Sequence, residues 1–248
     1  MRVFEATLGQ AEPIEIRPDM DKPRSHWSRR ELAFWLADVL ADTERAPCLV
    51  GIDHALSFPI EYFDLHGLQR DWDSFLNDFC AHWPTDVLQN TVLKILNLQK
   101  SAVHHRLGNA RWRRLADRSA GGAKSVFHFG VPGAVASSTH AGLPWIRFLR
   151  ADPRLLGKVH FWPFDGWVPP LEKSVVAEVY PALWNSQIKR HGFTQDQHDA
   201  CCVSLQLRAA AQDGCLTNWF SPQAWTNVHC TLEQLQIAQI EGWILGSV

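Results

Sequence analysis

Two acidic residues of this 248-residue chain lie where strands are expected to end. Asp53 directly follows the apolar run 48–52. Glu178 lies inside the β-branched run 175–179, just ahead of Pro181, which cannot continue a strand. Because open α/β sheets carry their sites at the carboxyl ends of strands, both carboxylates are candidates for chemistry. Each also has a structural interpretation, since Asp53 could cap the next turn and Glu178 could face solvent from an edge strand.

A third acidic position belongs to the expected start of a helix. Asp196 and Asp199 are three residues apart, so they share a helix face and favour its positive end. Their structural interpretation is an N-cap followed by a first-turn acid. Carboxylates from two strand ends and a helix nonetheless form a ligand set that suits Mg²⁺. Two such ions can activate water and stabilise the leaving oxygen in phosphodiester cleavage.

A basic stretch could hold the phosphates of such a substrate. Residues 100–124 contain seven Lys and Arg residues against Asp117 alone, a net +6 in a chain whose total charge is −2. Aromatic residues accompany the basic ones, as in proteins that follow a phosphate backbone. The phosphate-binding candidates are Lys124, Arg111, Arg113 and Arg114. A solvated helix face is the alternative interpretation, and the stretch alone does not decide between the two.

The chain lacks the signature motifs of several classes of enzyme. The chain has no Walker loop, no G-x-G-x-x-G and no G-x-S-x-G, which excludes P-loop nucleotide hydrolases, Rossmann enzymes and α/β-hydrolases. Its histidines and cysteines show no zinc-ligand spacing. The irregular cysteines and the absence of an apolar signal-peptide core lead us to expect a cytoplasmic protein with reduced thiols. No membrane span is expected, because no apolar run approaches about 18 residues.

The remaining pattern predicts an α/β fold in one domain over residues 1–248. Runs 1–6 and 13–17 predict a hairpin, and 48–52, 158–162 and 175–179 predict further strands. Ser28 and Glu31 form a capping box ahead of an amphipathic helix. Other helices are expected from residue 85 or 86, over 143–149, over about 197–212 and over 232–245, whereas 58–83 and 130–142 are expected to be irregular.

Short motifs in the same order resemble an uncharacterised family of RNase H-like proteins described as predicted nucleases. The matching segments are GIDHALSFP (51–59), KSVF (124–127), GL (142–143), HFWPFDG (160–166), EVYP (178–181), HDA (198–200) and EGWILG (241–246). The resemblance covers roughly residues 28–248. It implies an RNase H-like mixed sheet flanked by helices, with Asp53, Glu178 and Asp199 as catalytic acids that bind Mg²⁺ or Mn²⁺.

The family's opening strand, which bears an Asp followed by Trp and Ser or Gly, has no counterpart in this chain. In an RNase H-like sheet that strand is central, between the hairpin and the strand that ends at Asp53. We therefore expect an unpaired edge or gap beside 48–52, with the missing strand encoded upstream. The alternative is that 1–6 takes the central place, parallel to 48–53, which would make Glu5 the substitute ligand.

Two functions follow as hypotheses. The leading one is a divalent-metal-dependent nuclease, a hydrolase in which the three acids hold the metal and the basic residues steady the phosphate. The alternative is a non-catalytic RNase H-like module that binds a nucleic acid or a protein, its acids serving as caps and polar core links. The sequence does not distinguish DNA from RNA, nor does it give the oligomeric state.

Overall fold

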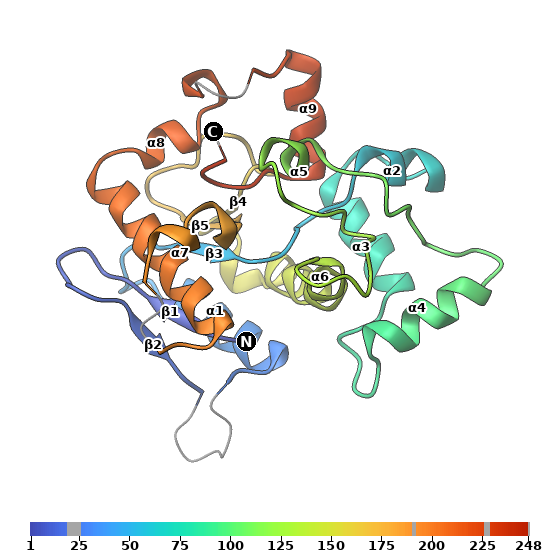
Figure 1. The fold of residues 1–248 in the computed structure, drawn as a ribbon, viewed down its shortest axis with the longest axis horizontal. Coiled ribbons are helices and arrows are strands. Elements are labelled where there is room, and N and C mark those ends of the chain that lie inside the picture. The colour runs from blue at the N-terminus through green and yellow to red at the C-terminus, as the bar shows by residue number, and fades with distance from the viewer. Residues whose placement is uncertain (19–25, 190–191, 226–228, 248) are drawn as a thin grey trace.

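Three short strands build the sheet that carries two of the predicted acids. In the computed structural model, which describes residues 1–18, 26–189, 192–225 and 229–247, β3 (Leu49–Ile52), β5 (Ser174–Glu178) and β4 (Val159–Phe161) lie in the order β3-β5-β4 (Figure 1). Both pairings are parallel. The predicted α/β class is confirmed. The RNase H-like assignment is finer than this and stays a prediction.

Helices cover both faces of this sheet. Their bounds are α1 Arg29–Ala41, α2 Ile60–His66, α3 Trp72–His82, α4 Val92–Ser101, α5 Leu115–Ser119, α6 Ala136–Ala151, α7 Gln195–Gln212, α8 Leu216–Trp219 and α9 Leu232–Glu241. Short 3-10 turns span Pro153–Leu155, Pro181–Leu183, Asn185–Gln187 and Pro222–Ala224. No helix in the described part of the chain has both the length and the apolar character needed to cross a bilayer.

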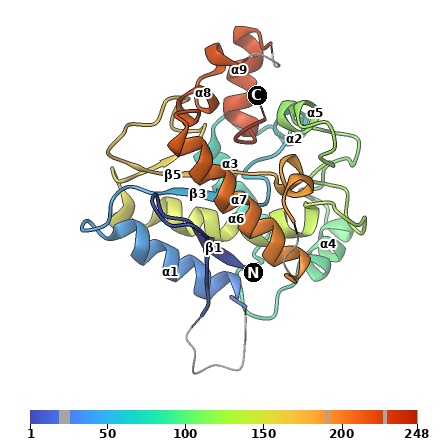
Figure 2. The same ribbon diagram turned by 60° about the vertical axis from the view of Figure 1, so that its left-hand side comes forward.

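The central strand β5 is buried on both sides, which explains its continuous apolar sequence. Val176 packs into a core built with α1, α2, α3 and α6, whereas Val175 and Ala177 pack into a second core with α7 and α9. Figure 2 shows α1 and α6 along one side of the sheet and α7 along the other. The carboxyl end of β5 is thereby fixed from two directions.

Local signals predicted several elements well. The Ser28–Glu31 capping box is present with both of its hydrogen bonds, and α1 begins at Arg29. The expected strands at 48–52, 158–162 and 175–179 correspond to β3, β4 and β5, each shifted by at most one residue at either end. The expected helix over 197–212 is α7, which begins two residues earlier because Thr194 supplies its N-cap.

Other expectations were wrong, and mostly because a cap was missed. The segment 58–83 is not irregular: it contains α2 and α3, and the Asp71 side chain caps α3 by accepting from the Ser74 N–H. The helix expected from residue 85 or 86 begins only at Val92, where Thr91 is the cap, after a left-handed Gln89. The expected loop 130–142 is helical from Ala136 onwards. The last helix stops at Glu241 rather than 245.

The hairpin does not join the main sheet. β1 (Val3–Glu5) and β2 (Ile14–Ile16) form a separate antiparallel pair, so the described residues hold a parallel sheet and a hairpin rather than one mixed sheet. β3 is an edge strand, bonded to β5 alone among the described strands, as expected for 48–52. Glu5 does not reach the end of β3, because it forms an ion pair with Arg45. It is therefore not a substitute ligand.

Candidate functional site

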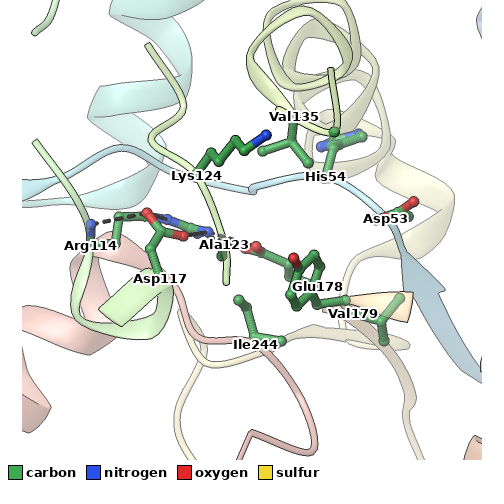
Figure 3. Close-up of a pocket in the computed structure, with 12 residues that line it drawn as sticks. Asp53, His54, Arg114, Asp117, Ala123, Lys124, Val135, Glu178, Val179 and Ile244 are labelled. Atoms are coloured by element: carbon green, nitrogen blue, oxygen red, sulfur yellow. Dashed lines mark hydrogen bonds and ion pairs between the residues drawn. The ribbon is translucent and has the colours of Figure 1, made fainter. Parts of the chain in front are cut away.

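Parallel pairing places Asp53 and Glu178 at the same edge of the sheet. Ile52 is in register with Glu178, so Asp53 follows immediately beyond that pair. A pocket at this edge is lined by Asp53, His54, Arg114, Asp117, Lys124, Glu178 and Tyr180 among others (Figure 3). Its enclosed part has room for about one water molecule. A nucleotide does not fit in this conformation.

Arg114 occupies both carboxylate oxygens of Glu178. Its two terminal nitrogens donate to Oε2 and Oε1, each at 2.6 Å. Arg114 is 1% exposed and Glu178 is 4% exposed, so water does not screen the pair. Burial raises the pKa of the Glu178 carboxyl, and the Arg114 guanidinium works against that rise. Glu178 is therefore a buried ion-pair partner and not an open ligand.

The same guanidinium also holds Asp117. Arg114 Nη2 donates to Asp117 Oδ1 at 2.8 Å, and the Arg114 backbone N–H donates to Asp117 Oδ2 at 3.0 Å. The second of these bonds fixes the first turn of α5. Asp117 is 1% exposed. One buried cation thus serves two buried acids, and its pKa is raised well above the ordinary value by them.

Glu241 links the same region to the last helix, a role that the sequence analysis missed. Its two oxygens accept from the backbone N–H groups of Ile60, at 2.7 Å, and Leu115, at 2.8 Å. These are the first residues of α2 and α5. The N-cap residues of these helices, Pro59 and Arg114, have no side-chain oxygen that accepts from a backbone N–H of the first turn. Burial raises the pKa of Glu241 to about 6. One carboxylate therefore caps two helices.

Asp53 differs from Glu178 because it is exposed and has no cation partner among the residues that the structure describes. Its pKa is raised to about 7, chiefly because protein atoms crowd the carboxyl, and further by the negative charges of Asp199, Glu178 and Asp196. The side chain still keeps an open face to solvent, which tempers the repulsion. Figure 3 shows Glu178 directed at Arg114 and Asp53 pointing away from that pair.

A pH dependence follows for Asp53. Its folded-state pKa lies above the ordinary value of 3.8, so its contribution to stability is complete below about pH 4 and is lost as the pH rises through about 7. We expect wild-type protein to lose stability relative to Asp53→Asn between about pH 4 and pH 7 in urea unfolding, with no further relative loss above that range. Parallel pH profiles of the two proteins would contradict the raised pKa, and Asp199→Asn should shift the wild-type profile to lower pH.

Asp199 is engaged by neutral donors. Its Oδ1 accepts from Asn185 Nδ2 at 2.9 Å and from Gln195 Nε2 at 2.8 Å. Its charge reaches Asp53, but among the described residues no three His, Cys, Asp or Glu side chains come close enough together to hold a metal ion. With both oxygens of Glu178 taken by Arg114, the three predicted acids do not fit a Mg²⁺ or Mn²⁺ site in this conformation.

The basic stretch is used largely inside the protein. Arg113 donates to the backbone carbonyls of Asp117 and Ala123, and Lys124 donates to the carbonyl of Pro132. Arg114 is buried, so it is not placed to meet a phosphate backbone. Of the four phosphate-binding candidates, Arg111 is exposed, Arg113 and Lys124 are half-buried, and Arg114 is buried. The run of positive charge in the sequence therefore does not form a continuous basic surface.

His54 packs against a helix that must carry glycine at one position. An added Cβ at Gly142, inside α6, would lie 2.1 Å from His54 Nε2. His54 is half-buried, and its Nδ1 contacts the Ala55 carbonyl oxygen at 2.9 Å. The protein atoms around the ring lower the pKa of His54 to about 4. His54 is therefore neutral near pH 7 and positions the turn after Asp53.

Comparisons with protein-family models, with curated protein sequences and with solved structures gave no match for this chain.

Proposed function

We propose that this protein is an RNase H-like module that binds a ligand at the carboxyl edge of its parallel strands and does not hydrolyse phosphodiesters. The buried bidentate ion pair between Arg114 and Glu178 carries the proposal. Metal-dependent phosphodiester cleavage needs carboxylates that are free to take divalent ions. Here a guanidinium already supplies the positive charge that such an ion would bring.

Displacing Arg114 by a metal ion is costly. The guanidinium is 1% exposed, so an ion that took Glu178 would leave Arg114 buried with fewer partners. Breaking a buried ion pair in this way costs about 3–5 kcal/mol. A weakly bound divalent ion does not offset that cost. This favours binding over cleavage at the edge.

The chemistry of the exposed edge limits the ligand class. Arg113, Arg114 and Lys124 are engaged by protein acceptors, which argues against a long nucleic-acid track. The pocket beside Asp53 is too small for a whole nucleotide. These observations favour a ligand or partner that contacts the carboxyl edge of the parallel strands through a single chemical group.

A cleavage assay tests the proposal. Purified protein is incubated with end-labelled single-stranded DNA, duplex DNA, RNA and an RNA–DNA hybrid, with Mg²⁺ or Mn²⁺. We expect no cleavage beyond that of the matched Asp53→Asn variant, which reports any contaminating nuclease. Cleavage that needs Mn²⁺ and disappears in Asp53→Asn would overturn the proposal.

One observation favours the metal-dependent nuclease as the second candidate. Asp53 is exposed and close enough to Asp199, Glu178 and Asp196 for their charges to raise its pKa. Mutual repulsion among carboxylates is relieved by a cation, so this edge would gain from a divalent ion. For that candidate Arg114 must first release Glu178.

A further inference from the structure

Large apolar side chains are exposed on and around α4. The inner face of this helix is buried, through Ile95, Leu96 and Gln99, and Figures 1 and 2 both show α4 at the periphery of the molecule, away from the sheet. Of the thirteen exposed large apolar residues in the described part of the chain, five lie within residues 87–103. Such a concentration goes beyond the single exposed apolar residues that any protein surface carries. These five side chains are 54–90% exposed: Val87, Leu88, Leu93, Leu98 and Val103.

The same segment is basic. The sequence has no Asp or Glu between residues 87 and 116, and Asp86 borders the segment at its beginning. Lys94 and Lys100 are exposed on α4. Lys94 Nζ donates to the neutral Asn90 side chain at 3.2 Å, and neither lysine forms an ion pair with a described residue. We call these two lysines and the five apolar residues the α4 surface; it combines apolar side chains with uncompensated positive charge.

The order of side chains around α4 indicates what covers this surface. Leu93 and Leu98 are five residues apart, so they lie about 140° apart around the helix axis, with Lys94 between them. A helix that docks into a protein groove carries its apolar anchors along one stripe instead. A second copy of the chain would bring lysines against lysines, which repel. The headgroup region of a bilayer accepts the mixed face, because leucines enter the acyl boundary while lysine stems extend their ammonium groups to the phosphates.

We propose that the α4 surface binds the surface of an anionic lipid bilayer. The exposed leucines and valines supply apolar area, and the lysines supply attraction to negatively charged headgroups. Binding of this kind lies on the bilayer and needs no spanning helix. The inference goes beyond the proposed function, since no residue that lines the pocket beside Asp53 lies between 87 and 103.

Vesicle binding tests the proposal. The full chain is sedimented with vesicles of phosphatidylcholine that contain about 30% phosphatidylserine, an anionic lipid, and with vesicles of phosphatidylcholine alone. We expect partitioning into the anionic vesicles to be stronger by about tenfold or more, and to fall as salt is added. The double substitution Leu93→Gln and Leu98→Gln should weaken it by about tenfold or more. Lys94→Gln with Lys100→Gln should weaken it by a similar factor.

A matched control removes two other leucines. Leu156 and Leu171 are 86% and 97% exposed and lie outside residues 87–103. Replacing both with Gln should change partitioning by less than about twofold, because apolar exposure elsewhere does not touch the bilayer. Thermal unfolding followed by circular dichroism should be nearly the same for all three double variants and wild-type protein, because most of the replaced side chains are well exposed.

Three results would overturn the proposal: no partitioning of wild-type protein into the anionic vesicles, equal partitioning into both kinds of vesicle, or unchanged partitioning of the Leu93→Gln and Leu98→Gln variant. A helical peptide with leucines on one face and glutamates on the other is the comparison probe. Binding of this peptide without binding of vesicles would assign the α4 surface to an acidic protein and would also overturn it. Failure of the proposed function looks different, because Mn²⁺-dependent cleavage would leave vesicle binding intact.

Discussion

Replacing Arg114 with methionine is expected to lower the free energy of unfolding by about 3–5 kcal/mol. The substitution keeps most of the side-chain volume but leaves Glu178 and Asp117 buried without their cation. It also removes the donor to the Glu241 carbonyl oxygen, at 3.3 Å. Urea unfolding at pH 7 measures the loss. A loss of this size on a marginally stable domain produces a large fall in the unfolding midpoint.

The matched control is Arg111→Met. Arg111 is an exposed arginine three positions before Arg114. This substitution should change the unfolding free energy by less than about 0.5 kcal/mol. Lowering the pH should partly rescue Arg114→Met, because burial raises the pKa of Glu178 and a protonated Glu178 no longer needs a cation. A loss below about 1 kcal/mol would mean that Arg114 is not the buried partner of these acids.

The second large effect is expected at Gly142. Alanine there would place Cβ 2.1 Å from His54 Nε2, inside a closely packed helix, and should cost about 1–3 kcal/mol. The cost should vanish in the background of His54→Ala, which removes the imidazole ring. In that background Gly142→Ala should be neutral or stabilising, since alanine is favoured over glycine in a helix interior by about 1 kcal/mol.

A double-mutant cycle of these two substitutions measures the coupling directly. Gly122→Ala is the control, because its added Cβ would meet only the Tyr180 hydroxyl at an ordinary 3.5 Å. Additive effects of Gly142→Ala and His54→Ala would show that the ring does not pack on this helix. Strong coupling would confirm how the turn after Asp53 is held.

Sequence reasoning succeeded where the deciding contacts are local. The Ser28–Glu31 box lies within one turn, and both of its bonds form between residues three apart. The ends of β3 and β5 followed from the apolar runs and from Pro181. Parallel pairing then required that Asp53 and Glu178 share an edge.

Sequence reasoning failed where the partner that decides a residue's role is distant in the chain. Arg114 and Glu178 are 64 residues apart, and Glu241 caps α5 across 126 residues. Neither contact leaves a local pattern, so Arg114 looked like one of several surface arginines. Charge alone does not show which cation of a basic stretch turns inward.

Titration of the wild-type chain with Mn²⁺, followed by electron paramagnetic resonance, tests the central claim most directly. If Arg114 holds Glu178 in place of a metal, no site should bind Mn²⁺ with a Kd below about 1 mM, equivalent to about 4 kcal/mol of binding free energy. Asp53→Asn and Glu178→Gln should then give the same titration as wild-type protein. Tighter Mn²⁺ binding that either substitution abolishes would contradict the claim.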